Sequence, residues 1–361
     1  MAAFHLRSLL RPELAELEAY VPDLGAYAIR LDANEAPPTL GDRARTRLAE
    51  AVEGPWERYP DPTARELREA IARRCNVSPA EVLPGVGSDE IIASLLTACN
   101  ASRGRHVASV LTTTPTFVMY RMSAKVRGMS VVEVPLDRQW DLPIDSLCRA
   151  AGMIAPALVF IASPNNPTGN LMSRQRLGAL VEAVPESLVV IDEAYIDYAD
   201  GDQLDLYRRY PNVAVMRTLS KVGFAALRVG WLVGSAELVA ELDKVRQPYN
   251  LNTLSQRLAT LVLDELGPEV ANATQGVVRE RERVAGALDQ LPGVEVAPRA
   301  ANFVWVRTPR PAGEVHTGLA ERGILVRSFH NRGGRLANHV RITISTPAEN
   351  DALLAAMREV V

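Results

Sequence analysis

The stretch from Leu188 to Lys221 reads LVVIDEAYIDYADGDQLDLYRRYPNVAVMRTLSK. It contains two short apolar runs, Leu188–Ile191 and Val213–Met216, and polar residues follow each of them directly. Upstream, Val107–Leu111 and Ala157–Ile161 repeat this pattern, with amphipathic stretches between the runs. Short runs rich in β-branched residues are typical of strands that are covered on both faces. The sequence therefore predicts an α/β fold, with a mostly parallel central sheet and helices on both of its faces.

The pattern changes after about residue 247. A helix is expected over 235–246 and a helical stretch over 255–291, and short alternating segments follow at 294–296, 303–306, 324–326 and 340–344. We therefore predict a large α/β domain over 45–247 and a smaller α+β domain over 248–361. The first 44 residues contain one helix and then a proline-rich irregular stretch with a first strand, and we expect this arm to pack with the small domain.

Composition excludes several classes of protein. The chain has 361 residues and a formal net charge of −3, so nothing points to nucleic acid as a partner. No apolar run approaches the length of a membrane span. The three cysteines are widely spaced and the five histidines show no ligand spacing, so we expect free thiols, no metal and a cytoplasmic location.

The candidate chemistry lies where predicted strands end, because ligands of open α/β sheets bind at the carboxyl ends of the strands. Asn166 in SPNNPTG, Asp192 with Tyr195, and Lys221 follow three of these strands. An amide, a carboxylate, a phenol and an amine on one edge would suit a pyridinium cofactor bound as an imine. Taken singly, Asp192 could instead cap a helix or form a buried ion pair, Tyr195 could be core, and Asn166 could be turn material.

The chain contains only three lysines, at positions 125, 221 and 244. Lys125 and Lys244 lie among charged residues, whereas Lys221 directly follows a buried strand. An amine that attacks an aldehyde must be neutral part of the time, and burial lowers the pKa of a lysine. Lys221 is therefore the candidate for a covalent bond to a cofactor.

A glycine loop, Gly85–Glu90, runs into an apolar helix and could expose backbone amides to a phosphate. We expect the amides of Ser88 and Asp89, next to Gly87, to bind it, with Ser220 and Arg228 as further donors. Simple helix capping by the two acidic residues of the loop is the alternative.

Aromatic and basic residues extend this candidate site. Phe117, which follows a strand, could stack on a ring or belong to the core. Arg327 and Arg341 lie on or beside apolar strands, where an arginine is costly to bury unless an anion pairs with it. An internal ion pair or an outward-facing side chain would also explain either arginine.

Five segments together resemble the fold-type I aminotransferases that depend on pyridoxal phosphate, most closely the histidinol-phosphate aminotransferases of the class II subgroup. In the family's order they are SPNNPTG, VVIDEAYIDY, RTLSK, ANFVWVR and HVRITIST. By this resemblance Lys221 carries the cofactor and moves the substrate proton, Asp192 pairs with the pyridinium, and Tyr195 and Asn166 bind the ring oxygen. The resemblance assigns the cofactor phosphate to Gly87, Ser88, Asp89, Ser220 and Arg228, ring stacking to Phe117, and the substrate to Arg341, Arg327, Asn166, Tyr20 and Asn34.

The resemblance implies transamination between L-histidinol phosphate and 2-oxoglutarate, with glutamate as amino donor in the reverse direction, as a step in histidine biosynthesis. It also implies a homodimer with shared active sites, in which Tyr59 reaches the partner subunit's cofactor phosphate. An aromatic amino-acid aminotransferase and a threonine-phosphate decarboxylase are the alternatives, because their substrates carry similar anionic groups. A regulatory module that binds pyridoxal phosphate is a third, disfavoured by the short arm and the acidic net charge.

Overall fold

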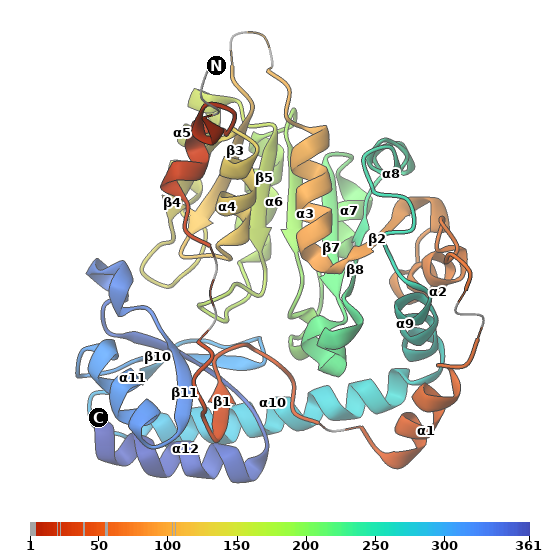
Figure 1. Ribbon diagram of the computed structural model, residues 1–361. Coiled ribbons are helices and arrows are strands. Elements are labelled where there is room, and N and C mark those ends of the chain that lie inside the picture. The colour runs from red at the N-terminus through yellow and green to blue at the C-terminus, as the bar shows by residue number, and fades with distance from the viewer. Residues whose placement is uncertain are drawn as a thin grey trace.

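The computed structural model describes residues 5–19, 21, 23–38, 40–54, 57–102, 104 and 106–361. Figure 1 shows two sheets, a larger one above and a smaller one below, with the long helix α10 (Gly267–Asp289) along the bottom. The larger sheet has seven strands in the order β2-β8-β7-β6-β5-β3-β4. They are β2 (Val82–Val86), β3 (Ser109–Thr114), β4 (Ser130–Pro135), β5 (Leu158–Ala162), β6 (Leu188–Asp192), β7 (Val213–Thr218) and β8 (Val229–Val233).

Pairing in the larger sheet is parallel from β7 to β4, and β8 is antiparallel to both of its neighbours. Alternate side chains of a strand enter different layers: Leu158 and Phe160 of β5 belong to one apolar cluster, and Val159 and Ile161 to the other. The first cluster includes residues of α3 (Gly87–Ala98), α4 (Met119–Val126) and α8 (Ala236–Asp243), and the second includes residues of α5 (Ile144–Ile154), α6 (Arg174–Ala183) and α7 (Leu204–Arg209). Helices therefore cover both faces, and the α/β prediction is confirmed.

The smaller sheet has five strands in the order β1-β11-β12-β10-β9. They are β1 (Ile29–Leu31), β9 (Glu295–Val296), β10 (Phe303–Arg307), β11 (Ile324–Ser328) and β12 (His339–Thr343). The first strand of the arm, β1, pairs in parallel with β11, so this part of the arm lies on the smaller sheet. Helices α11 (Ala312–Glu321) and α12 (Pro347–Val360) accompany the sheet.

The helical stretch expected over 255–291 is two helices, α9 (Thr253–Glu265) and α10. They meet at Leu266, and Pro268 lies in the first turn of α10, where its missing N–H leaves no hydrogen bond unmade. Helix α9 contacts α2 (Arg65–Cys75), which follows α1 (Asp42–Glu50). Because α9 lies after residue 247 and α2 lies before it, this contact crosses one of the predicted domain boundaries. The boundaries at residues 44 and 247 stay a prediction. Among the described residues, no helix has the length and apolar character of a membrane span.

Candidate active site

Three parallel neighbours of the larger sheet bring the candidate residues to one edge. In the register, Ala162 of β5 lies beside Asp192 of β6, which lies beside Met216 of β7. Lys221 follows β7 by three residues, and its Nζ lies 5.8 Å from the centre of the Tyr195 ring. The carboxylate, the phenol and the amine are therefore neighbours, as the strand ends predicted.

Asp192 is buried among groups that fix both of its oxygens. The hydroxyl of Tyr120 donates to Oδ2 over 2.6 Å, and the amide of Ala194 donates to Oδ1 over 3.0 Å. Burial raises the pKa of Asp192 to about 6, although these two hydrogen bonds and Lys221 act to lower it. A buried carboxylate held in this way is suited to bind a cationic ring nitrogen.

Tyr120 is a site residue that the sequence analysis missed. It is fully buried and stacks on Phe160 with ring centres 4.9 Å apart. Phe117 is half-buried, and its ring meets Tyr120 edge to face at 5.6 Å. Phe117 precedes α4, and its carbonyl oxygen accepts a hydrogen bond from the amide of Tyr120, in the first turn of that helix, over 3.4 Å. No sequence motif distinguished Tyr120, because its contact with Asp192 depends on the order of the strands.

The backbone around Lys221 forms a tight turn over Ser220–Phe224, in which Gly223 has a φ of 101°. The hydroxyl of Tyr198 donates to the carbonyl oxygen of Lys221 over 2.6 Å, which fixes the start of the side chain. Of the other two lysines, Lys244 is exposed and pairs with Glu241 over 2.5 Å, and Lys125 is half-buried on α4. Lys221 is therefore the lysine at the strand-end cluster.

The arm and the smaller sheet complete this cluster. The amide of Asn34, in the arm, donates to the hydroxyl of Tyr195 over 2.8 Å. Arg341, in β12, donates to the side-chain oxygen of Asn166 over 2.5 Å and also to the carbonyl of Asp32. The arm therefore contacts Tyr195 through Asn34, and the smaller sheet contacts the SPNNPTG segment through Arg341.

Arg327 and Arg341 lie beside each other in the register of β11 and β12, so their side chains leave the same face of the sheet. Arg341 is buried, with 8% of its surface exposed, whereas Arg327 is exposed. Two arginines that are register partners on one face, one buried and hydrogen-bonded and one exposed, could bind an anionic group of a ligand.

The start of α3 has the geometry of a phosphate site. Gly87 has a φ of 70°, and a Cβ on it would lie 2.7 Å from Nη2 of Arg228. A Cβ on Gly230 would lie 2.8 Å from the carbonyl carbon of Gly87 and 2.9 Å from the amide nitrogen of Ser88. The two glycines thus let β8 and Arg228 approach the first amides of the helix, where an anion binds well.

Arg228 has two contacts near this helix start. It pairs with Asp89 over 3.5 Å, and its Nη1 donates to the hydroxyl of Ser220 over 3.4 Å. About half of each side chain in the Arg228–Asp89 pair is exposed, so this pairing is weak. The structure therefore has features that fit both interpretations of the loop, helix capping and phosphate binding. A bound anion would compete with Asp89 for the guanidinium of Arg228.

The two remaining predicted residues are Tyr20 and Tyr59. Tyr20 lies outside the described residues. Tyr59 is 81% exposed, and its ring stacks on Tyr249 at 4.7 Å between ring centres.

Comparison with known proteins identifies the family. Residues 21–357 match the family model described as aminotransferase class I and II. The chain is 39% identical over 355 residues to histidinol-phosphate aminotransferase 2 of Nitrosococcus oceani, which covers 97% of this chain and 96% of that protein. It is 36% identical to the histidinol-phosphate aminotransferase of Caldanaerobacter subterraneus, with 99% of both chains covered.

A solved structure agrees with this result. The fold matches that of histidinol-phosphate aminotransferase from Sinorhizobium meliloti in complex with pyridoxal-5'-phosphate, with a TM-score of 0.86. The two sequences are 25% identical, and the match covers 99% of this chain and 98% of the other. The chain therefore belongs to the class I and II aminotransferases.

Proposed function

We propose that the protein transfers an amino group between L-histidinol phosphate and 2-oxoglutarate, with pyridoxal phosphate bound to Lys221. The observation that carries this proposal is the position of Lys221 beside Tyr195 and Asp192, at one edge of a parallel sheet. The names of relatives at 36–39% identity over nearly the full length support the substrate.

The residues present fit the cofactor. The start of α3 with Gly87, Ser88, Asp89, Ser220 and Arg228 would hold its phosphate, since Gly230 leaves the helix amides accessible to an anion. Phe117 would stack on its ring. Bound pyridoxal phosphate supplies an aldehyde that carries the amino group and a ring that accepts the electron pair from the substrate Cα.

The side chains of this protein have three tasks. The buried carboxylate of Asp192 would keep the ring nitrogen of the bound cofactor protonated. Tyr195 and Asn166 would donate to the ring oxygen, and Asn34 holds the tyrosine in place. Once the amine of the substrate has taken its place on the cofactor, the freed amine of Lys221 would move the proton from the substrate Cα, since it is held at the same edge.

Arg341 and Arg327 would bind the anionic group of each substrate in turn, and we propose Asn34 and Tyr20 of the arm as further substrate ligands. Replacing Arg341 with Gln should lower kcat/KM for histidinol phosphate and for glutamate by about 30- to 100-fold, because a charge-assisted pair is lost. Steady-state kinetics with both substrates checks this. Arg307→Gln is the matched control, since Arg307 lies in the same sheet and pairs with Glu295 at the surface. Equal losses in the two variants would contradict the role of Arg341.

Gly230→Ala should weaken cofactor binding by about tenfold or more and lower the melting temperature. The new Cβ would meet backbone atoms of Gly87 and Ser88, which cannot move without displacing the helix start. Equilibrium dialysis against pyridoxal phosphate measures the affinity. Gly178→Ala is the control, because the Cβ there would meet nothing within 4 Å. An unchanged affinity in Gly230→Ala would argue against phosphate binding at this helix.

The test of the reaction is an assay with purified, cofactor-loaded protein. We expect glutamate-dependent amination of imidazole acetol phosphate. A large preference for aromatic keto acids would make the protein an aromatic amino-acid aminotransferase. Release of carbon dioxide from threonine phosphate would make it a decarboxylase. Either result would contradict the proposed substrate while leaving the cofactor site intact.

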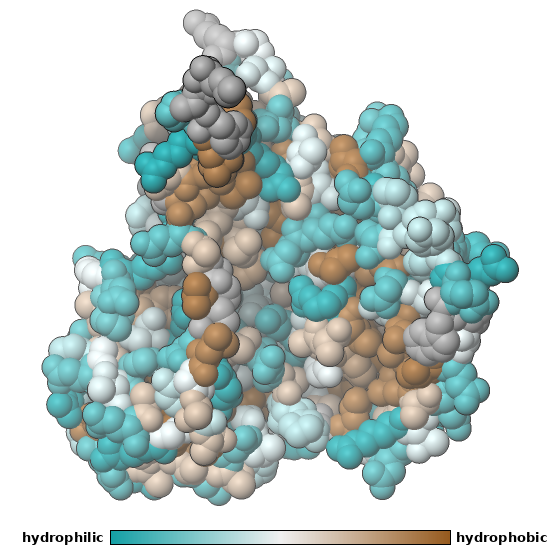
Figure 2. All heavy atoms as spheres, in the orientation of Figure 1, coloured by the Kyte–Doolittle hydropathy of each residue, from teal (hydrophilic) through white to brown (hydrophobic). Residues whose placement is uncertain are grey.

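We further propose a homodimer with shared active sites in the cytoplasm. Apolar side chains of the arm and its surroundings are exposed, among them Leu9 at 71% and Leu24 at 82%, and Figure 2 shows hydrophobic residues gathered near the N-terminal segment. Exposed Tyr59 would reach the partner's cofactor phosphate. The cysteines at 75, 99 and 148 are not joined in a disulfide in the described part of the chain, which supports a reducing compartment. Light scattering should give twice the chain mass of 39.3 kDa; the mass of a single chain would contradict the dimer.

A further inference from the structure

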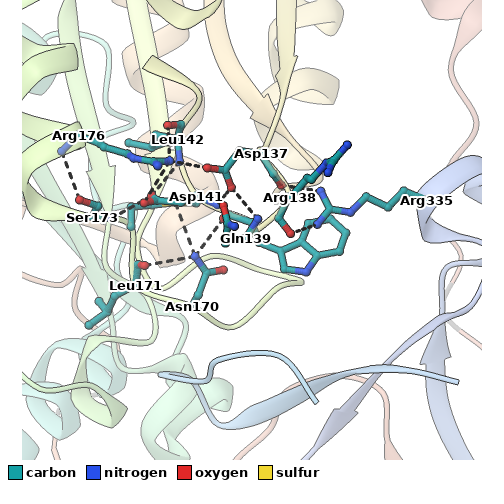
Figure 3. Close-up of polar contacts among 12 residues, drawn as sticks. Asp137, Arg138, Gln139, Asp141, Leu142, Asn170, Leu171, Ser173, Arg176 and Arg335 are labelled. Carbon is teal, nitrogen blue, oxygen red and sulfur yellow. Dashed lines mark hydrogen bonds and ion pairs between the residues drawn. The ribbon is translucent and has the colours of Figure 1, made fainter. Parts of the chain in front are cut away.

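The connection between β4 and α5, residues 136–142, forms a rigid loop that we call the strap. One carboxylate oxygen of Asp137 accepts hydrogen bonds from the amides of Gln139 and Asp141, each over 2.9 Å. Arg176 pairs with the other oxygen over 2.5 Å and donates to the carbonyl of Leu142 over 3.0 Å. Figure 3 shows these contacts converging on the strap. The strap is therefore held against α6, one of the helices that cover the larger sheet.

Trp140 lies in the strap with a left-handed backbone, at a φ of 65°. A bulky side chain rarely adopts this conformation, and it persists where the surroundings hold it. Here the amide of Asn170 donates to the carbonyl oxygen of Trp140 over 3.0 Å. The ring is 92% buried and meets Trp305 of β10 edge to face at 5.9 Å and His339 of β12 at 5.4 Å. The indole therefore points from the strap into the smaller sheet.

Arg335 is the second residue that connects the strap with the smaller sheet. It lies in the connection between β11 and β12, and its Cζ is 3.3 Å from the centre of the Trp140 ring. Its two terminal nitrogens donate to the carbonyl oxygens of Asp137 and Arg138, each over 2.5 Å. Figure 3 shows the side chain extending from the ribbon of the smaller sheet to these carbonyls. A cation stacked on an indole and bonded to two carbonyls is a strong contact between the two parts of the protein.

The same region is connected to the substrate arginine. Asn170, which holds the Trp140 carbonyl, accepts a hydrogen bond from Thr168 over 2.6 Å, and its backbone carbonyl accepts from the amide of Asn165 over 2.9 Å. The next residue, Asn166, accepts from Arg341. The chain segment from Arg335 to Arg341 is therefore attached to the larger sheet at both ends, once through the strap and once through Asn166.

We propose that Trp140 and Arg335 are positioning residues. Together they form an interdomain latch, defined by these two side chains, that sets where Arg341 lies relative to Asn166 and so sets the affinity for the anionic group of the substrate. The proposal rests on the proposed function of Arg341. Neither latch residue touches the reacting atoms, so loss of the latch should affect substrate binding and leave the chemical step unchanged.

The kinetic test uses three variants of the cofactor-loaded protein. Arg335→Gln removes the cation, Trp140→Gly removes the ring while accepting the left-handed backbone, and Arg335→Lys retains a cation. We expect KM for histidinol phosphate and for glutamate to rise about tenfold in the first two variants, with kcat within about twofold, and Arg335→Lys to recover part of the loss. Arg332→Gln, an exposed arginine in the same connection, is the control and should behave as wild type.

The two latch variants should also be coupled. The double variant Arg335→Gln with Trp140→Gly should raise KM by less than the product of the two single effects, because the stacking of Arg335 on Trp140 is lost in all three variants. Unchanged KM in both single variants would overturn the proposal. A fall in kcat as large as the rise in KM would do so too, because the latch would then be part of a general structural effect.

Hydrogen exchange separates this proposal from the proposed substrate. In the wild type, the amides of Gln139 and Asp141 are hydrogen-bonded, and we expect faster exchange over 137–142 and 339–343 in Arg335→Gln. If histidinol phosphate is not a substrate but exchange rises and KM for glutamate increases, the latch stands and the substrate assignment fails. If histidinol phosphate is turned over and exchange is unchanged, the latch is overturned.

Discussion

Replacing Lys221 with alanine is expected to lower kcat by at least about 10⁴-fold, because one amine serves as covalent anchor of the cofactor and as proton carrier. Lys125, on α4, and Lys244, paired with Glu241 at the surface, are not placed to take over either task. The assay is turnover of histidinol phosphate with 2-oxoglutarate by protein loaded with pyridoxal phosphate.

Two measurements show whether this loss is specific. Lys244→Ala should retain activity within about twofold, because an exposed surface pair contributes little. The melting temperature of Lys221→Ala without cofactor should stay near that of the wild type, since the side chain is only half-buried. Normal turnover by Lys221→Ala would refute the assignment of the anchor.

Replacing Asp192 with asparagine is expected to lower kcat by about 10²- to 10³-fold, because a neutral amide does not keep the ring nitrogen protonated. Asparagine retains the size of the side chain, and one oxygen remains to accept from Tyr120 or Ala194. The same turnover assay measures the loss. Asp243→Asn, at a part-exposed carboxylate on α8, is the control for the chemical change and should have little effect on kcat.

The same variant should change the pH dependence of folding in the cofactor-free protein. Burial raises the pKa of Asp192 from its ordinary value of 3.8 to about 6, so the folded state holds this proton longer than the unfolded state. The contribution of Asp192 to the free energy of unfolding should therefore fall by about 3 kcal/mol as pH rises from below 4 to above 6. Urea unfolding at several pH values measures this contribution as the difference between the wild type and Asp192→Asn, because the other titrating groups are common to both proteins. Identical curves would contradict a buried, ionising Asp192.

Much of the larger sheet could be predicted because its central strands are buried on both faces. The runs in β5, β6 and β7 are mostly apolar and rich in β-branched residues, which leaves few alternatives. The boundary between α9 and α10 was missed because the apolar periodicity continues across Leu266, although Pro268 marks the start of the second helix. Pro268 is a local signal for the start of a helix, but the apolar periodicity of the whole stretch predicted one continuous helix.

The candidate site also contains both residues that could be predicted from the sequence and residues that could not. Asp192 and Lys221 could be predicted because each follows a strand, and neighbouring parallel strands end at one edge. The contact of Tyr120 with Asp192 could not, since it depends on the order of strands in the sheet and on the side-chain orientation in α4. Arg335 and Trp140 are 195 residues apart and meet only because the smaller sheet lies against the strap. No pattern within a short stretch of sequence predicts a contact between residues so far apart in the chain.

The most direct test is a single turnover with histidinol phosphate and no 2-oxoglutarate. Cofactor-loaded protein should lose the visible absorbance of the lysine-bound cofactor and release one imidazole acetol phosphate per subunit. Added 2-oxoglutarate should restore the absorbance and yield one glutamate. Absorbance that is unchanged by histidinol phosphate, or product formed without any change at the cofactor, would contradict the account.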